Sequence, residues 1–311
     1  MKKLLFTLLA GLIGFTSFCQ TATENGKSLI EAYIGPLGNS LGAALNNGWY
    51  NTAKPHSLGG FDITITANIV MVPTTAKTFN ITKSTEGTFT GGETPTILGP
   101  KDGGAFVKYG GEEETMPTGF DLPIIPLPML QAGVGLIKNT ELDFRYMPEV
   151  GDDVKVGLFG IGLKHDILQW LPIADKAPID LSIQAGYTKI SSEVKLDNPD
   201  PTITSAPPKA NLGISATTVN LILSKKLLMF TPYLGVGYNS TRTTFNVAGK
   251  YSIAGLQEIE LDELTDIDFE SNNNLRANIG FRFNIAVMAL QANYTFAEYQ
   301  TATVGIGISV R

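Results

Sequence analysis

The sequence predicts an all-β protein that spans a membrane as a closed antiparallel β-barrel. Three observations lead to this fold class: long segments alternate apolar and polar residues, their connections alternate between short and long, and aromatic residues recur near segment ends. Many segments reach the ~9–11 residues that a tilted strand needs to cross a bilayer, whereas strands of soluble sheet proteins average ~5–6. This combination favours a transmembrane barrel over a soluble sandwich.

Residues 1–20 have the features of a secretory signal peptide. Two lysines precede an apolar run from Leu4 to Phe18, which is too short for a transmembrane helix of ~20 residues. We expect cleavage after Cys19 or Gln20, which leaves a mature chain without cysteine and therefore without disulfides. The whole chain has 23 Lys and Arg against 29 Asp and Glu, and this acidic balance argues against nucleic acid as a partner.

Residues 21–57 are predicted to form an N-terminal helical segment. A period of 3.6 indicates two short helices, from Gly26 to Tyr33 and from Pro36 to Asn46, with Pro36 at a first helical position and Asn47-Gly48 ending the second helix. Their apolar surface needs a partner, so we expect the segment to dock into or across the periplasmic mouth of the barrel as a hatch, or plug. The expected hatch residues are Leu37, Leu41, Leu45 and Trp49.

From Leu58 onward the period changes from 3.6 to 2, so residues 58–311 are predicted to form the barrel. Counting the alternating segments gives about twelve strands, within a range of about 10 to 14. The segments are 61–72, 77–83, 104–109, 129–137, 141–146, 154–163, 179–188, 210–223, 228–247, 274–285, 288–296 and 302–310.

One segment interrupts the pattern with regularly spaced prolines, between Asp121 and Pro128. Proline has no N–H to donate to a neighbouring strand, so it is excluded from a central ladder. The sequence therefore predicts an edge, a bend or a crossover into the barrel here, and a lateral gate is the alternative.

Five charged residues on the polar faces of predicted strands are candidate lumen residues. An arginine at mid-bilayer on the lipid side costs ~2–4 kcal/mol, so these charges are expected to face the lumen. They either pair across a plugged lumen or form a constriction that selects solutes. The five are Glu141, Asp143, Arg145, Arg276 and Arg282.

No catalytic residue, metal site or cofactor is predicted. The only histidines are His56 and His165, and the chain contains no Gly-x-Ser-x-Gly motif that would mark a serine nucleophile. The acidic stretch from Glu258 to Glu270 lacks the spacing of a calcium-binding loop and is interpreted as a solvated external loop.

The pattern from Leu58 to Arg311, preceded by a signal peptide and a helical segment, resembles outer-membrane barrel proteins. The order of these parts is similar to that of a barrel family distantly related to the outer-membrane transporters of long-chain fatty acids and aromatic hydrocarbons. In those transporters an N-terminal segment plugs the lumen, and the stretch from Gly26 to His56 is the similar piece. Two features differ, because the chain has no Asn-Pro-Ala tripeptide and ends in Arg311 instead of an aromatic residue.

These observations favour a non-enzymatic, porin-like protein in the outer membrane of a Gram-negative bacterium that binds or passes a small molecule, including a hydrophobic one. The alternative is a plugged structural or interaction barrel whose external loops are the functional surface. A membrane-embedded hydrolase and a soluble secreted β-protein are the remaining alternatives. The expected partners are outer-membrane lipid and a small hydrophobic ligand.

Overall fold

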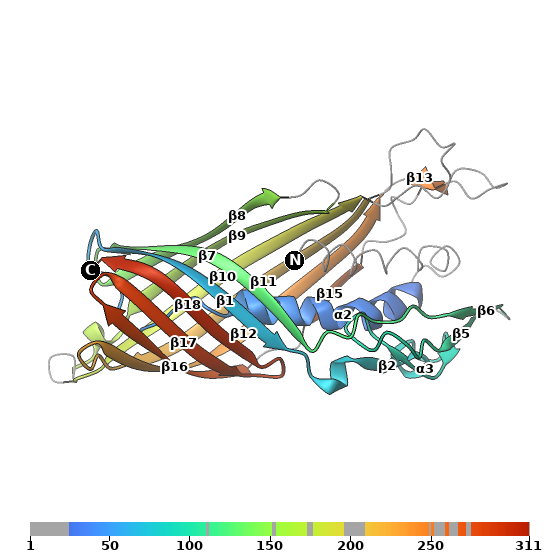
Figure 1. Cartoon of the computed structure of the whole chain (residues 1–311), viewed down its shortest axis with the longest axis horizontal. Helices are drawn as coiled ribbons and strands as arrows, with labels where there is room; N and C mark the ends of the chain where they lie inside the picture. The colour runs from blue at the N-terminus through green and yellow to red at the C-terminus, as the bar shows by residue number, and fades with distance from the viewer. Residues whose placement is uncertain are drawn as a thin grey trace.

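In the computed structural model of the chain, antiparallel strands close into a barrel (Figure 1). The structure describes residues 25–109, 112–150, 154–172, 177–195, 209–248, 250–251, 259–260, 267–271 and 275–310. Within these residues ten strands form the wall, and the last pairs with the first along Phe61↔Val310 to Val70↔Thr301. The prediction of an all-β barrel is confirmed, with ten wall strands where about twelve were expected.

The wall strands follow one another around the barrel in chain order. They are β1 (Phe61–Met71), β7 (Ile124–Leu136), β8 (Thr140–Val150), β9 (Val154–Asp166), β10 (Asp180–Lys195), β11 (Lys209–Ser224), β12 (Phe230–Ala248), β16 (Leu275–Ile285), β17 (Met288–Phe296) and β18 (Thr301–Val310).

Side chains alternate across this wall as the period of 2 requires. In β1, Ile63 and Ile65 are exposed on the outside, whereas Thr64 between them is buried. In β16, Phe281 is 43% exposed and the next residue, Arg282, is 1% exposed. The exterior is therefore apolar and the lumen polar or charged at these positions, which is the arrangement of a barrel surrounded by lipid.

The two ends of the barrel differ in their connections. At one end, here called the turn end, the strands are joined by residues 137–139, 167–179, 225–229 and 286–287. The last residues of β18 also lie at this end. At the other, the loop end, the long connections are residues 72–123, 196–208 and 249–274, and the short ones are residues 151–153 and 297–300. Short periplasmic turns and longer external loops are typical of outer-membrane barrels.

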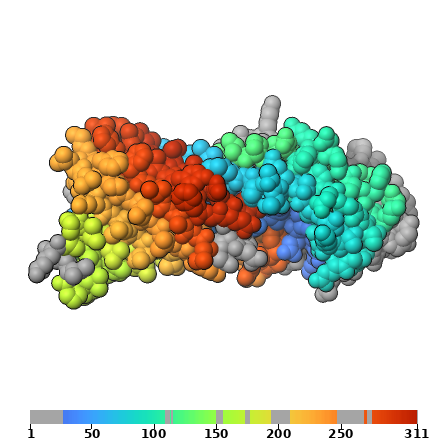
Figure 2. Space-filling view, turned by 90° about the horizontal axis from the view of Figure 1, so that it is seen from below, coloured from blue at the N-terminus to red at the C-terminus, as the bar shows by residue number. Residues whose placement is uncertain are grey.

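Within residues 72–109 and 112–123, small sheets lie beyond the loop end, at the right of Figure 2. Two of the predicted barrel strands, 77–83 and 104–109, lie here, and their assignment to the wall was wrong. The observed strands in these stretches are too short to cross a bilayer. The elements are η3 (Thr74–Ala76), β2 (Thr78–Asn80), α3 (Ile81–Ser84), β3 (Thr90–Gly91), β4 (Glu93–Pro95), β5 (Phe106–Tyr109) and β6 (Glu112–Thr115).

Four further short elements complete the described chain. The strand β15 (Ile267–Ser271) pairs with the part of β12 that extends beyond β16. The others are η4 (Leu168–Trp170) at the turn end and the paired strands β13 (Lys250–Tyr251) and β14 (Ile259–Glu260) near the loop end. Within the acidic stretch from Glu258 to Glu270, residues 258 and 261–266 lie outside the described residues.

The N-terminal segment contains one continuous helix, α2 (Asn25–Asn46), and the prediction of two helices was wrong. Pro36 lies inside α2 and cannot donate the usual hydrogen bond, a defect that costs ~3 kcal/mol in an isolated helix. Around and after the proline the helix is buried by the barrel wall, which offsets this cost. Within the described residues, no helix combines the length and apolar character needed to cross a membrane.

The wall has one incompletely paired seam, between β7 and β8. These strands pair only from Gln131↔Arg145 to Leu136↔Thr140, and they diverge toward the loop end (Figure 1). Pro126 and Pro128 lie in the unpaired part of β7, which still pairs with β1 on its other side. Of the predicted alternatives, the structure shows an edge: the prolines lie inside a strand, but at a local edge where a missing N–H leaves no partner unsatisfied.

Candidate functional site

The lumen is filled by residues 25–57, here called the plug. Near its start, Tyr33 Oη donates to the carbonyl of Thr118 at 2.9 Å, in the loop-end segment. Near its end, His56 lies against Ser309, one residue before the end of β18. The plug therefore runs along the lumen from the loop end to the turn end, whereas the sequence led us to expect a segment docked into or across the periplasmic mouth.

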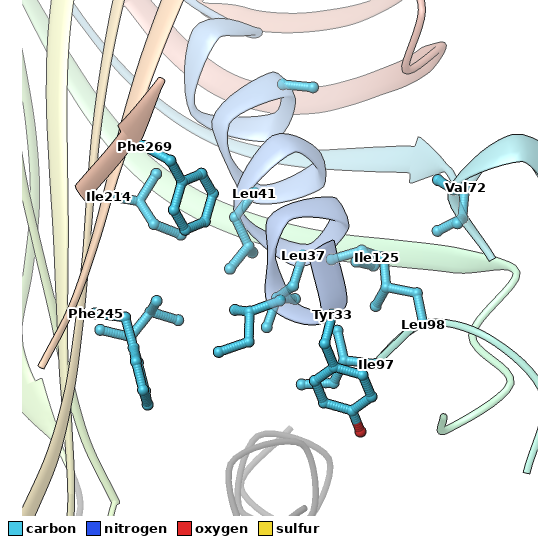
Figure 3. Close-up of a cluster of buried hydrophobic side chains, with 14 of the residues drawn as sticks. Tyr33, Leu37, Leu41, Val72, Ile97, Leu98, Ile125, Ile214, Phe245 and Phe269 are labelled. Atoms are coloured by element: carbon cyan, nitrogen blue, oxygen red, sulfur yellow. The ribbon is translucent and has the colours of Figure 1, made fainter. Parts of the chain in front are cut away.

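The loop-end half of the lumen is apolar. Figure 3 shows Leu41 of α2 facing Ile214 of the wall strand β11 and Phe269 of β15, and Phe245 and Leu37 belong to the same buried cluster. All of these side chains are at most 7% exposed. Burial of this apolar surface is the main force that holds α2 against the wall.

Two glycines one helical turn apart let α2 approach β12 closely. A Cβ on Gly38 would lie 2.4 Å from Thr243 Oγ1, and a Cβ on Gly42 would lie 2.3 Å from Thr241 Cγ2. Such distances are below any ordinary contact, so no larger residue fits at either position without moving the helix or the wall.

Two arginines from different parts of the wall bind the C-terminal end of α2. Arg145 donates from Nη1 and Nη2 to the carbonyls of Leu45 and Asn47 at 2.7 and 2.8 Å. Arg276 donates from Nη1 to the carbonyl of Asn46 at 2.6 Å. These carbonyls have no partner within the helix and carry the negative end of its dipole, so the two cations satisfy both needs.

After α2, the plug continues along the wall through aromatic and polar contacts. The guanidinium of Arg145 lies 3.6 Å from the ring centroid of Trp49, a cation–π contact in a buried site. Tyr50 Oη donates to Asn278 Oδ1 at 2.8 Å, and Arg282 Nη1 donates to Asn51 Oδ1 at 2.7 Å. The wall thus binds three successive plug residues, Trp49, Tyr50 and Asn51, after the end of α2.

Glu141 binds the C-terminal end of the plug at His56. Its Oε2 accepts from the backbone N–H of His56 at 2.7 Å and lies 2.7 Å from His56 Nδ1, while its Oε1 accepts from Lys164 Nζ at 2.7 Å. His56 Nε2 lies 3.1 Å from Ser309 Oγ. His56, Glu141 and Lys164 are each at most 2% exposed, so this is a buried and charge-compensated network.

All five predicted lumen residues lie on the inner face of the wall. Arg145, Arg276 and Arg282 contact the plug, Glu141 contacts it through His56, and Asp143 accepts from Gln131 Nε2 at 3.3 Å. The four expected hatch residues, Leu37, Leu41, Leu45 and Trp49, are buried in the lumen.

Sequence reasoning missed Lys164, His56, Asp62 and Gln131. Asp62 and Gln131 do occupy polar positions of alternating segments, so periodicity held a signal for them. Lys164 follows the predicted end of its strand, and His56 precedes the first strand, so neither position could be assigned to a face.

Little free space remains between the residues that the structure describes in the turn-end half of the lumen, which is polar. A small polar cavity of about 10 Å³ lies between the plug and the wall, bordered by Trp49, Asp62 and Gln291. A volume of this size holds about one water molecule. Among the described residues, no group of three or more acidic, histidine or cysteine side chains is placed to hold a metal ion.

A closed barrel with an apolar exterior, a polar inner face and a lumen filled by its own N-terminal segment belongs to the class of outer-membrane β-barrels. The chain itself belongs to a family of unknown function (DUF6588), whose model matches residues 1–310. Among curated proteins, no sequence matches the chain.

Several solved structures are similar to this chain at low sequence identity. The translocator domain of the autotransporter NalP from Neisseria meningitidis has 12% identity and a TM-score of 0.33, over 90% of this chain and 96% of that one. Ail from Yersinia pestis has 10% identity and a TM-score of 0.29, over 81% and 98%. The TodX monoaromatic hydrocarbon channel has 8% identity and a TM-score of 0.28, over 82% and 67%.

Proposed function

We propose that the protein is a non-enzymatic barrel of the Gram-negative outer membrane, exported with a cleaved signal peptide, which binds or passes a small apolar molecule when the plug moves. The observation that carries this proposal is the division of the lumen. The loop-end half is lined by apolar side chains, and the turn-end half is closed by a hydrogen-bonded polar network. Once α2 moves, the apolar lining of the first half suits an apolar molecule, whereas the polar network of the second half disfavours one.

The incompletely paired seam between β7 and β8 supports the proposal that the ligand is apolar. Leu127 and Met129 face inward along the unpaired part of β7 and belong to the apolar cluster around α2. Beyond the last β7–β8 pair, no ladder between these strands closes the wall within residues 124–150. A molecule that displaces side chains there meets lipid on the outside, a route that suits an apolar solute and excludes an ion.

A reversible cross-link between plug and wall tests the proposal. A Cβ on Gly38 would lie 3.2 Å from Thr243 Cβ, close to the ~3.5–4.5 Å of a disulfide, so a Gly38→Cys, Thr243→Cys pair should lock α2 to β12. We expect the wild type in proteoliposomes to take up a naphthylamine dye that fluoresces in apolar surroundings. The oxidised pair should take it up several-fold more slowly, and a reductant should restore the rate.

The same pair kept reduced is the main control, because it carries both substitutions, including the enlarged residue at Gly38, without the bond. The two single-cysteine variants, which cannot form the bond, show the effect of each substitution alone. If the oxidised pair and the singles take up the dye equally, plug movement is not required. If no form exceeds protein-free liposomes, the barrel passes no such molecule, and the alternative of a plugged structural or interaction barrel replaces the proposal.

A second candidate is a membrane-embedded hydrolase, favoured by one observation. Ser309 Oγ, His56 and Glu141 follow one another at 3.1 and 2.7 Å in the order of a serine–histidine–acid triad. We rank it second because Glu141 also binds Lys164 and the His56 backbone, which fits an anchoring role. Covalent labelling by a fluorophosphonate, lost in Ser309→Ala, would establish the hydrolase. An unlabelled, correctly assembled barrel would reject it.

A further inference from the structure

Large apolar side chains are exposed on the connections at the turn end. Leu228 is 92% exposed and Leu58 is 72% exposed, values typical of charged residues in a protein surrounded by water. We call this set the turn rim. It consists of Leu58, Ile137, Trp170, Leu171, Leu228 and Val287.

The backbone at Leu228 is unfavourable as well as its exposure. Leu227 and Phe230 exchange backbone hydrogen bonds at 2.7 and 2.9 Å, which forces Leu228 to a φ of +56°. The left-handed region disfavours a residue with a side chain and is normally occupied by glycine or asparagine. A leucine that is both strained and exposed points to an apolar partner outside the chain.

The turn rim continues the lipid-facing surface of the wall. The outward residues next to the turns, Leu136, Phe230 and Ile285, are 37%, 40% and 50% exposed. Apolar side chains are therefore exposed both at the strand ends and on the turns. The boundary of the surrounding apolar medium lies at the turns themselves.

Basic residues lie beside the turn rim. Lys138, Lys225 and Lys226 are exposed on two of the turns, and Lys54 is exposed where the plug leaves the lumen. Of the acidic residues described at this end outside the lumen, Asp166 accepts from the backbone N–H of Leu168 and Asp180 lies 3.4 Å from Ser224 Oγ. Four exposed lysines thus outnumber these two half-buried aspartates among the residues described at this end, so their balance of charge is positive.

We propose that the turn end is a binding surface for anionic phospholipids of the leaflet that surrounds it. The turn rim contacts the acyl region, and the lysines reach the phosphate groups with their long side chains. Trp170 occupies the head-group level that tryptophan prefers. Its orientation is fixed, because its Nε1 donates to His165 Nε2 at 3.0 Å and the two rings stack with centroids 6.3 Å apart.

The two tryptophans make a direct test possible. Trp170 is 65% exposed at the turn end and Trp49 is 1% exposed in the lumen, so lipid-borne quenchers should act on Trp170 alone. The full-length protein is inserted into vesicles of equal phosphatidylcholine and phosphatidylglycerol, with one of the two brominated. We expect brominated phosphatidylglycerol to quench Trp170 at least twofold more than brominated phosphatidylcholine. Trp170→Phe should remove the difference and supply the Trp49 baseline.

Reversing the charge of two lysines tests whether Lys225 and Lys226 cause the preference for anionic lipid. Lys225→Glu with Lys226→Glu should bring the two quenching values together, while Lys83→Glu with Lys101→Glu makes the same charge change in the loop-end segment and should leave them apart. Equal quenching by both brominated lipids in the wild type would overturn the selectivity for anionic lipid. Quenching of Trp170 by aqueous iodide in place of lipid would show that the turns lie in water and overturn the whole proposal.

Discussion

Charged side chains of the lumen act mainly on the plug. Periodicity predicted that Arg145, Arg276 and Arg282 face inward, because an arginine against lipid is costly at mid-bilayer. Their partners could not be predicted, since alternation assigns a face but does not say which distant backbone lies opposite. The carbonyls at the end of α2 are more than 90 positions away in sequence from either arginine that binds them.

Arg145 offers the sharpest test at the residue scale. Arg145→Ala removes two hydrogen bonds to plug carbonyls and the cation over Trp49, so we expect the plug to open more often. Planar-bilayer recordings should show at least a tenfold rise in brief conducting events. Arg242→Ala is the matched control, because Arg242 is exposed and pairs with Asp268 at the loop end. Equal event rates in the two variants would contradict the anchoring role.

The helix α2 shows where local sequence rules stop. Propensity and capping predicted its apolar stripe and its end near Asn46, but Pro36 led to a predicted break that the lumen overrides by burying the residues around it. The two strands wrongly predicted for the wall, 77–83 and 104–109, were also predicted from local sequence alone. Residues 77–83 alternate well enough, but alternation alone does not distinguish a wall strand from a small sheet beyond the barrel.

Close contact between α2 and β12 predicts a strong effect of side-chain size. Gly42→Val places methyl groups where Thr241 already lies, and overpacking of this kind costs ~1–3 kcal/mol. The variant should lose its fast, folded gel mobility at a temperature several degrees below that of the wild type. Gly92→Val is the control, since a Cβ at Gly92 meets no atom within 4 Å. A Gly42 variant as heat-resistant as the Gly92 variant would show that α2 is not tightly packed against the wall.

At the scale of the whole molecule, the path of the plug through the lumen predicts on which side of the membrane α2 begins. The chain runs from the loop end to the turn end, and long connections of outer-membrane barrels are external. Lys27 should therefore be at the cell surface, and Lys225 should face the periplasm.

Single cysteines test this orientation in living cells, because the mature chain is expected to have none of its own. Lys27→Cys should react with a membrane-impermeant maleimide on intact cells, whereas Lys225→Cys should react only after the outer membrane is permeabilised. Both positions are exposed, so accessibility to the reagent decides the outcome. The reverse pattern would mean that the barrel is inserted the other way round.

Deleting the plug tests the central claim, that residues 25–57 close the lumen, most directly. Barrels of ~8 strands are packed by wall side chains alone, so ten strands leave a lumen that the plug must fill. Removal of Gly26 to Trp49 should leave a barrel that inserts and still runs faster unheated than boiled, but with a steady conductance several-fold above that of the full chain in planar bilayers. A correctly inserted, truncated barrel whose conductance equals that of the full chain would contradict the claim.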